Sequence, residues 1–311
     1  MRFLIVAKKE FIDQVTSRKF IATLAVFLLF LGFMLYSGFT SMGTEEPSLH
    51  FAALFSFIGT GSMSFFGGIL GILLGFDLIT KEKESGTLKT LLSHPVFRDE
   101  VITGKAIGGF AALAVVVAVT LSLLLGAVVL TGYIPSADDM ITFLKFAAVT
   151  LAYFFTFFAL GLFTSAVSKS TTTSLLISIG IFILLAIFVP FFSFMIANAI
   201  AGPPPEPPAM EERVEIGPNG KVIGYNISED PRWQEYEKER EEYWKKRDAV
   251  ESTLMLLSPV MNYMTLANSL ASETFYSFES RDLTKNWVGF FATPVIFFAV
   301  AYLRFVREEL V

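Results

Sequence analysis

The residue types that perform most enzymatic chemistry are scarce in this sequence. Cysteine is absent, which excludes disulfides, thiolate metal ligands and a cysteine nucleophile. The two histidines, His50 and His94, are distant in the chain and neither belongs to a His-Glu-x-x-His motif, so a zinc site or a histidine-based triad is not expected. Gly104-Lys105 lacks the earlier glycine and the following Ser or Thr of a phosphate-binding loop. We therefore predict no catalytic residues, no metal and no cofactor on this chain.

Ion pairing is the chemistry that the sequence favours instead, within residues 77–105. Charges dominate Lys81 to Glu84, and Ser85 and Gly86 then break the pattern. An apolar stripe follows and a proline closes it: Leu88, Leu91, Leu92 and Pro95. We expect a short amphipathic helix over 80–92, with its charges at one end and free to pair. Such a helix either shields a loop or contacts a cytoplasmic partner.

Six apolar runs surround this charged segment. Hydrophobic residues make up 53% of the chain and charged residues 17%, whereas soluble domains contain about 25% charged residues. A membrane-spanning helix needs roughly 20 predominantly apolar residues. We therefore predict an all-α polytopic membrane protein with six transmembrane helices, at about 20–40, 52–79, 106–133, 141–167, 173–201 and 286–304.

Glycine and proline predict departures from straight helices in three of these spans. The second span is long and contains six glycines, so we expect it to extend past the hydrocarbon or to bend, and we expect its glycines to allow close helix packing. Pro190 in the fifth span and Pro294 in the sixth lack a backbone donor, which predicts kinks at both positions.

The centres of the six spans contain no ionisable side chain. Asp77 lies near one end of the second span and Lys145 near one end of the fourth. Ionisable residues deep in a membrane usually form proton or ion relays. Their absence argues against a pump or proton-coupled carrier that is powered by its own residues. The remaining polar residues, such as Thr120, Tyr153 and Ser178, are expected to bind neighbouring helices.

Lysine and arginine are concentrated in alternate loops, and this sets the orientation. They occur before the first span, between the second and third, at Lys169 between the fourth and fifth, and after the sixth, whereas 41–51 and 134–140 contain none. Because short positively charged loops stay in the cytoplasm, we expect a multi-pass protein of the cell membrane with both termini cytoplasmic. Six spans then place 202–285 outside.

Residues 3–19 have the pattern of an amphipathic helix before the first span. Five apolar residues share one face, and the charged residues lie largely off it: Phe3, Leu4, Ala7, Phe11 and Val15 against Lys8, Lys9, Asp13 and Arg18. Such a helix tends to lie in the membrane interface, in contact with lipid. The alternative is a simple helical lead-in to the first span.

The exterior segment 202–285 contains sixteen acidic and ten basic residues, which argues against a nucleic-acid partner. It begins with a stiff proline-rich spacer, and two alternating runs around 218–220 then predict a β-hairpin. Asp230 and Pro231 predict a helix start, and the helix should continue for about 20 residues with an aromatic flank. After Pro259 we expect an interfacial or re-entrant piece. This predicts a small α+β extracytoplasmic insert that a partner outside the cell could contact.

The charged segment resembles the signature of ABC-2 type permeases. In that signature an acidic-basic-acidic cluster precedes Gly-Thr-Leu, a Leu-Leu pair, Pro-Val, an Arg and Gly-Lys; here these are Glu82, Lys83, Glu84, Gly86, Thr87, Leu88, Leu91, Leu92, Pro95, Val96, Arg98, Gly104 and Lys105. An N-terminal amphipathic elbow helix, six spans and a larger exterior region between the fifth and sixth also resemble the family. The insert is larger than that of minimal members.

The resemblance implies a transmembrane permease subunit of an ATP-driven ABC transporter, of the export type, that is not itself an enzyme. Such permeases form homodimers or pair with a related permease, and a separate ATP-binding subunit holds ATP and Mg. The residues that the resemblance assigns to contact with that subunit are Lys81, Glu82, Lys83, Glu84, Ser85, Gly86, Thr87, Leu88 and Leu91, with Ser168 and Lys169 as a smaller second contact. Lys8, Lys9 and Glu10 would belong to the elbow helix.

These inferences divide the chain into three parts: 1–201 with the elbow helix, five spans and the cytoplasmic coupling helix, 202–285 as the extracytoplasmic insert, and 286–311 with the sixth span and a cytoplasmic tail. Two other functions stay open, a stand-alone channel or secondary carrier, and a membrane receptor or assembly protein that acts through the insert. Spans rich in Phe, Leu and Gly suit a hydrophobic or amphipathic cargo, or a closed dimer seam.

Overall fold

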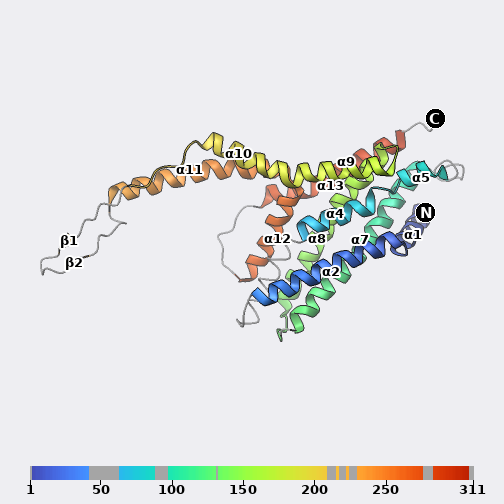
Figure 1. Cartoon of the computed structure of the whole chain (residues 1–311), viewed down its shortest axis with the longest axis horizontal. Coiled ribbons are helices and arrows are strands. Elements are labelled where there is room, and N and C mark those ends of the chain that lie inside the picture. The colour runs from blue at the N-terminus through green and yellow to red at the C-terminus, as the bar shows by residue number, and fades with distance from the viewer. Residues whose placement is uncertain are drawn as a thin grey trace. The chain divides into compact units, whose positions relative to one another are not determined.

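The computed structural model describes residues 2–41, 63–87, 97–130, 132–208, 215–216, 222–223, 230–275 and 283–307. Along the chain its elements are α1 (Arg2–Val15), α2 (Arg18–Ser41), α4 (Met63–Gly75), α5 (Thr80–Glu84), α7 (Arg98–Leu130), α8 (Ala137–Val167), α9 (Thr171–Ile183), the π-helical turn η2 (Leu184–Phe188), α10 (Val189–Ala201), β1 (Glu215–Ile216), β2 (Val222–Ile223), α11 (Pro231–Met255), α12 (Pro259–Phe275) and α13 (Thr284–Arg307) (Figure 1). They form two compact units, Met1–Ile187 with Ser258–Val311 and Phe188–Leu257.

Six helical segments of the described chain are long and apolar enough to cross a membrane: Arg18–Ser37, Met63–Glu84, Arg98–Leu130, Ala137–Val167, Thr171–Ala201 and Thr284–Arg307. The predicted architecture, a polytopic all-α membrane protein with six spans, is confirmed. Residues 52–62 of the predicted second span lie outside the described residues.

Two spans begin earlier than their apolar runs because polar residues start the helix. In α8, Ser136 forms a capping box with Asp139, in which each side chain accepts from the backbone of the other. In α7 the first turn contains Asp99 and Glu100, whose negative charges interact favourably with the positive end of the helix dipole. The sequence predicted only the apolar cores of these helices.

The core of the first unit is α8, against which α4, α12 and α13 pack. Its aromatic side chains Phe154, Phe157 and Phe158 are fully buried. A Cβ at Gly71 or Gly75 of α4 would overlap carbonyl oxygens of α8, so only glycine allows the two backbones to approach this closely. The glycines of the second span therefore act as predicted.

The second span is interrupted by a turn at 76–79, between α4 and α5. Phe76 N still donates to Ile72 O, but helical geometry resumes only at Thr80. The sequence predicted that this span bends or extends past the hydrocarbon, and the structure shows a break in the helix near one end of the span. The break separates the four-turn membrane part from the short charged helix α5.

α1 is a separate helix, which ends at Val15 and is followed by a turn at 16–17 rather than continuing into α2. It packs along α7, where Gly104 and Gly108 leave room for its backbone. Ala7 is buried in this contact. Part of its predicted apolar face therefore covers α7.

The fifth span contains α9, η2 and α10 in succession. The π-helical turn ends at Phe188, two residues before Pro190. Since proline has no N–H and its ring crowds the preceding turn, a wider turn accommodates it at the place where the sequence predicted a kink. In the sixth span, Pro294 lies inside a helix that continues through it.

The second unit pairs α10 with α11. Asp230 caps α11 by accepting from Arg232 N at 2.9 Å, and Pro231 occupies the first turn, as the sequence predicted. The Arg247 guanidinium donates to Asn198 Oδ1 at 2.8 Å and lies over the rings of Phe194 and Trp244. β1 and β2 form a two-residue antiparallel ladder.

α12 belongs to the first unit, although the sequence grouped it with the insert. Tyr263 and Leu266 are both buried in the core, where α12 packs against α8 and α13. The second unit ends at Leu257 and begins at Phe188, within the fifth span. These limits follow from packing, whereas the predicted insert 202–285 is a division by side of the membrane.

Candidate functional site

The charged helix α5 is held in place by hydrogen bonds at the break that precedes it. Ser165 of α8 accepts from Ile79 N at 2.9 Å and from Thr80 N at 3.0 Å. These are two of the N–H groups that the interrupted helix leaves without an intrahelical acceptor. Thr80 and Ser165 are both fully buried. One α8 hydroxyl therefore fixes where α5 begins.

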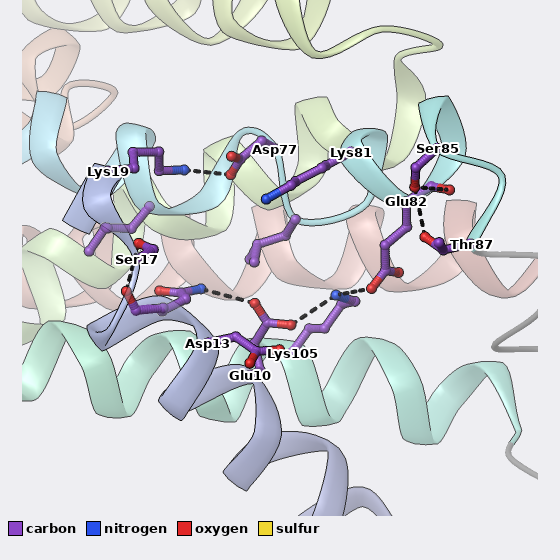
Figure 2. Close-up of a pocket in the computed structure, with 13 residues that line it drawn as sticks. Glu10, Asp13, Ser17, Lys19, Asp77, Lys81, Glu82, Ser85, Thr87 and Lys105 are labelled. Atoms are coloured by element: carbon purple, nitrogen blue, oxygen red, sulfur yellow. Dashed lines mark hydrogen bonds and ion pairs between the residues drawn. The ribbon is translucent and has the colours of Figure 1, made fainter.

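Lys105 of α7 forms ion pairs with carboxylates from two other helices. Its Nζ lies 2.9 Å from Glu10 Oε2 of α1 and 2.8 Å from Glu82 Oε1 of α5 (Figure 2). The Lys105 side chain is only 5% exposed. A lysine this deep needs charged partners, because burial of an unpaired ammonium is very unfavourable. We call these three residues the Lys105 triad; it links α1, α5 and α7.

Two further charges of α5 bind the ends of α8 and α9. Lys83 Nζ donates to Ala166 O at 2.8 Å, at the carbonyl end of α8. The Glu84 carboxylate accepts from Thr171 N at 2.8 Å and from the Thr171 hydroxyl at 2.6 Å, at the amide end of α9. Each charge has the sign that the helix end attracts, a cation at the carbonyls and an anion at the amides. Of the four charges of α5, Glu82, Lys83 and Glu84 therefore bind other helices of the same chain, whereas Lys81 is exposed.

A polar cavity of about 360 Å³ lies between α1, α2, α4, α5 and α7. Figure 2 shows the Lys105 triad along it and the Lys19–Asp77 ion pair on the opposite side, at 2.6 Å. Its lining residues are Glu10, Asp13, Gln14, Ser17, Lys19, Leu74, Asp77, Leu78, Lys81, Glu82, Ser85, Thr87 and Lys105. The cavity thus adjoins both α1, the predicted elbow helix, and the residues Ser85 and Thr87 that follow α5.

Comparison with known proteins decides the family. A model of the family described as "ABC-2 family transporter protein" matches residues 4–310, nearly the whole chain. This chain belongs to the ABC-2 transporter family. The resemblance that the charged segment suggested is confirmed over both units.

Two curated proteins are similar to part of this ABC-2 protein. The probable ABC transporter permease protein NosY of Pseudomonas aeruginosa is 31% identical over 111 residues, 33% of this chain and 37% of that protein. The protein of the same name from Stutzerimonas stutzeri is 32% identical over 120 residues, 36% of this chain and 40% of that one. The chain therefore spans about two fifths of the length of the curated relatives it matches.

The residues predicted at the ATPase contact of this ABC-2 protein have different environments. Lys81, Ser85, Gly86 and Thr87 are exposed, and so is Lys169. Glu82, Lys83 and Glu84 bind α7, α8 and α9, whereas Ser168 is buried. Leu88 and Leu91 lie outside the described residues. In the elbow helix Lys8 and Lys9 are exposed, whereas Glu10 joins the triad.

Sequence reasoning quoted Lys105 as part of the motif but gave it no role, and it missed Ser165. The buried position of Lys105 has a signal in the sequence, since it follows the glycine that lets α1 approach α7. Ser165 has none, because serine is common in membrane helices and only its contacts distinguish this one.

Proposed function

We propose that this ABC-2 protein is the membrane subunit of an ATP-driven transporter and that a separate ATP-binding subunit docks on its cytoplasmic face, at the segment that begins with α5. A second copy, or a related permease, completes the membrane part, and the direction is export. Membership of the family and the permease relatives support the first statement. Dimerisation and export rest on family analogy.

The observation that carries this proposal is the set of contacts made by α5. Four of the five residues of this short helix are charged, and three of them, Glu82, Lys83 and Glu84, bind α7, the end of α8 and the start of α9. A force applied to α5 reaches three membrane helices through short, charge-assisted contacts. Rigid-body displacement of packed helices is a known way to convert ligand binding into conformational change.

The exposed residues of α5 and of its continuation are then the docking surface, together with Lys169. Lys81, Ser85 and Thr87 are exposed, and Gly86 with φ 71° ends the helix. The charged side chains bound to α7, α8 and α9 transmit the displacement, and of these Glu84 is also exposed on the docking surface. The residues predicted to contact the ATPase thus have two roles, docking to the ATPase and transmission of its displacement to the membrane helices.

The orientation follows from the same assignment. We place both termini, α1 and α5 in the cytoplasm, with α11 and the hairpin outside, as the distribution of lysine and arginine favours. Leu4 and Ile5 of α1 are 51% and 71% exposed, with Lys8 and Lys9 nearby, a pattern that suits contact with lipid at the interface.

Co-purification tests the proposal directly. The tagged chain, extracted from its own membranes, should bring an ATP-binding subunit identified by mass spectrometry, and the purified complex should hydrolyse ATP in lipid nanodiscs. Lys81→Glu should weaken this complex, whereas Asp138→Lys, an exposed charge change at the opposite ends of the spans, should leave it intact. Ion flux through liposomes that contain this chain alone, with no associated ATPase, would instead establish a stand-alone channel or carrier.

A further inference from the structure

At the break in the second span, hydroxyl groups of neighbouring helices replace a backbone hydrogen bond. In a continuous helix Thr80 N would donate to Phe76 O. Here Thr80 N donates to Ser165 Oγ of α8 at 3.0 Å, and Phe76 O accepts from Ser174 Oγ of α9 at 2.7 Å. Both serines are fully buried. Two side chains are thus inserted into the hydrogen-bond ladder, one at the donor and one at the acceptor.

The residues of the break do not themselves require it. The segment 76–79 contains neither proline nor glycine, and no residue other than glycine has a positive φ in the described chain. Ile79, the last residue of the break, has φ −108° and ψ −43°, in the right-handed helical region. Helical bonding resumes at Lys81 N, which donates to Asp77 O at 3.0 Å. The interruption therefore comes from tertiary contacts, and the local backbone can complete the helix.

We propose that the break is a two-state switch between this hydroxyl-held form and a continuous second span. In the continuous form Ile79 N and Thr80 N donate to the carbonyls four residues earlier. The hydroxyls of Ser165 and Ser174 then donate to carbonyls of their own helices, as serine commonly does. Each backbone donor keeps a partner in both forms, so the two forms need differ little in free energy.

The first turn of α9 holds both ends of this switch. Ser174 binds the carbonyl of Phe76, just before α5. Thr171, three residues earlier on α9, binds the carboxylate of Glu84 at the end of α5. Ser174 is itself in contact with Thr164 Oγ1 of α8, at 3.1 Å. A displacement of α5 therefore acts on α9 at two points, one of which is the break.

The polar cavity gives the break space to rearrange. Leu74, Asp77 and Leu78 of the second span line this cavity of about 360 Å³. A turn that was packed on all sides could not change its backbone path, since protein interiors are close-packed. Lys19 of α2 contacts the same turn, because its Nζ lies 2.6 Å from Asp77 Oδ1 and 4.6 Å from the centre of the Phe76 ring. The break thus contacts α2, α8 and α9 and adjoins a cavity.

The switch rests on the proposed function and adds a mechanical step to it. An ATP-binding subunit that displaces α5 converts one form into the other, while α4 stays packed on α8 through its glycines. Completing the helix rotates and shifts α5, because each residue of an α-helix adds about 100° and about 1.5 Å. Ser165 and Ser174 are then positioning residues, which act through the backbone of the second span and decide the form populated at rest.

Distances between two spin labels test the switch. The chain has no cysteine, so Ser85→Cys at the end of α5 and Lys169→Cys between α8 and α9 can carry the labels; both residues are exposed. The whole chain is measured in nanodiscs without ATPase, first with no other substitution. Adding Ser165→Ala and Ser174→Ala removes both hydroxyls, so the main distance should shift by about 3 Å or more as the helix is completed.

Ser193→Ala is the matched control. Ser193 is also buried, but its hydroxyl donates to Val189 O of its own helix at 2.7 Å, so its removal should leave the label distance unchanged. Ser174→Ala alone is the milder variant if the double variant does not fold. It leaves Thr80 N paired with Ser165, and it should populate both distances.

An unchanged distance in the folded double variant, or in Ser174→Ala where only that variant folds, would show that the break is fixed and would overturn the switch. The proposed function would stand, because no ATPase takes part in this measurement. Failure of the chain to co-purify with an ATPase would instead overturn the proposed function, and the label distances would still decide whether the break has two forms.

Discussion

At the scale of single residues, Lys105 is a lysine whose side chain is almost fully buried between helices. A lysine with a 5% exposed side chain binds carboxylates from two helices that are far apart in sequence, at 2.9 and 2.8 Å. The Lys105 ammonium is stable only while its partners stay in place, because it has been removed from water. The triad therefore links the position of α5 to that of α1.

Lys105→Met is expected to destabilise the protein by about 1–3 kcal/mol, because Glu10 and Glu82, whose side chains are 14% and 24% exposed, would lose their shared cation. Unfolding of the detergent-purified chain, followed by heat or denaturant, measures the effect. Adding Glu10→Gln and Glu82→Gln to the same variant should restore much of the loss, since no unpaired charge is left. Equal stability of Lys105→Met and the wild type would contradict the buried triad.

Ser165→Ala should cost about 1–3 kcal/mol, because the backbone N–H groups of Ile79 and Thr80 lose their shared acceptor. Ser122→Ala is the control. Its hydroxyl donates to Ala118 O of its own helix, which keeps its backbone hydrogen bond, so its removal should change stability little. The same unfolding measurement compares the two variants, and equal losses would show that Ser165 does not hold the break.

At the scale of elements, the contact between α4 and α8 is the most restrictive. Gly71 and Gly75 face the backbone of α8, and no side chain fits between the two helices there. Dispersion contacts between closely packed helices contribute much of the stability of membrane proteins. The pair α4–α8 should therefore move as one body when α5 is displaced.

Gly75→Ala should destabilise the protein by about 1–3 kcal/mol, because its Cβ overlaps the Phe158 carbonyl and the helices must separate. Gly126→Ala makes the same chemical change in α7, where nothing lies within 4 Å of the added Cβ, and should leave the unfolding temperature unchanged or slightly higher. A Gly75→Ala protein as stable as Gly126→Ala would show that α4 and α8 are not in close contact.

At the scale of the whole molecule, the sidedness of the membrane decides which surfaces an ATPase can reach. The chain contains no cysteine, so single cysteines can be introduced without a background. Lys169 lies between the fourth and fifth spans, and Asp138 lies at the start of the fourth; both are exposed. These two positions report on opposite faces of the membrane.

A membrane-impermeant maleimide should label Asp138→Cys and Glu237→Cys in intact cells, and Lys169→Cys only after permeabilisation. This pattern follows from six spans with cytoplasmic termini. The reverse pattern would invert the topology, and it would place α5 outside, away from any cytoplasmic ATPase. Labelling of all three positions in intact cells would show that the membrane had been broken.

The sequence predicts those features of this protein that depend on neighbouring residues, and it does not predict those that depend on tertiary contacts. The six spans follow from the length of apolar runs, and the start of α11 follows from its capping residues, because both signals are local. The family follows from one ordered motif. The roles of Glu82, Lys83 and Glu84 did not follow, because alternating charges at a helix end look the same whether they face a partner or their own chain.

The sequence by itself therefore determined the membrane class of this protein, its helices, its family and the segment where charge gathers. Only the tertiary structure decided that the α5 charges bind α7, α8 and α9, that Lys105 is buried between two carboxylates, and that α12 joins the first unit. The physical reason is the separation in sequence over which each interaction acts. Hydropathy and capping act within a few residues, whereas an ion pair between Glu10 and Lys105 exists only after helices distant in sequence have packed together.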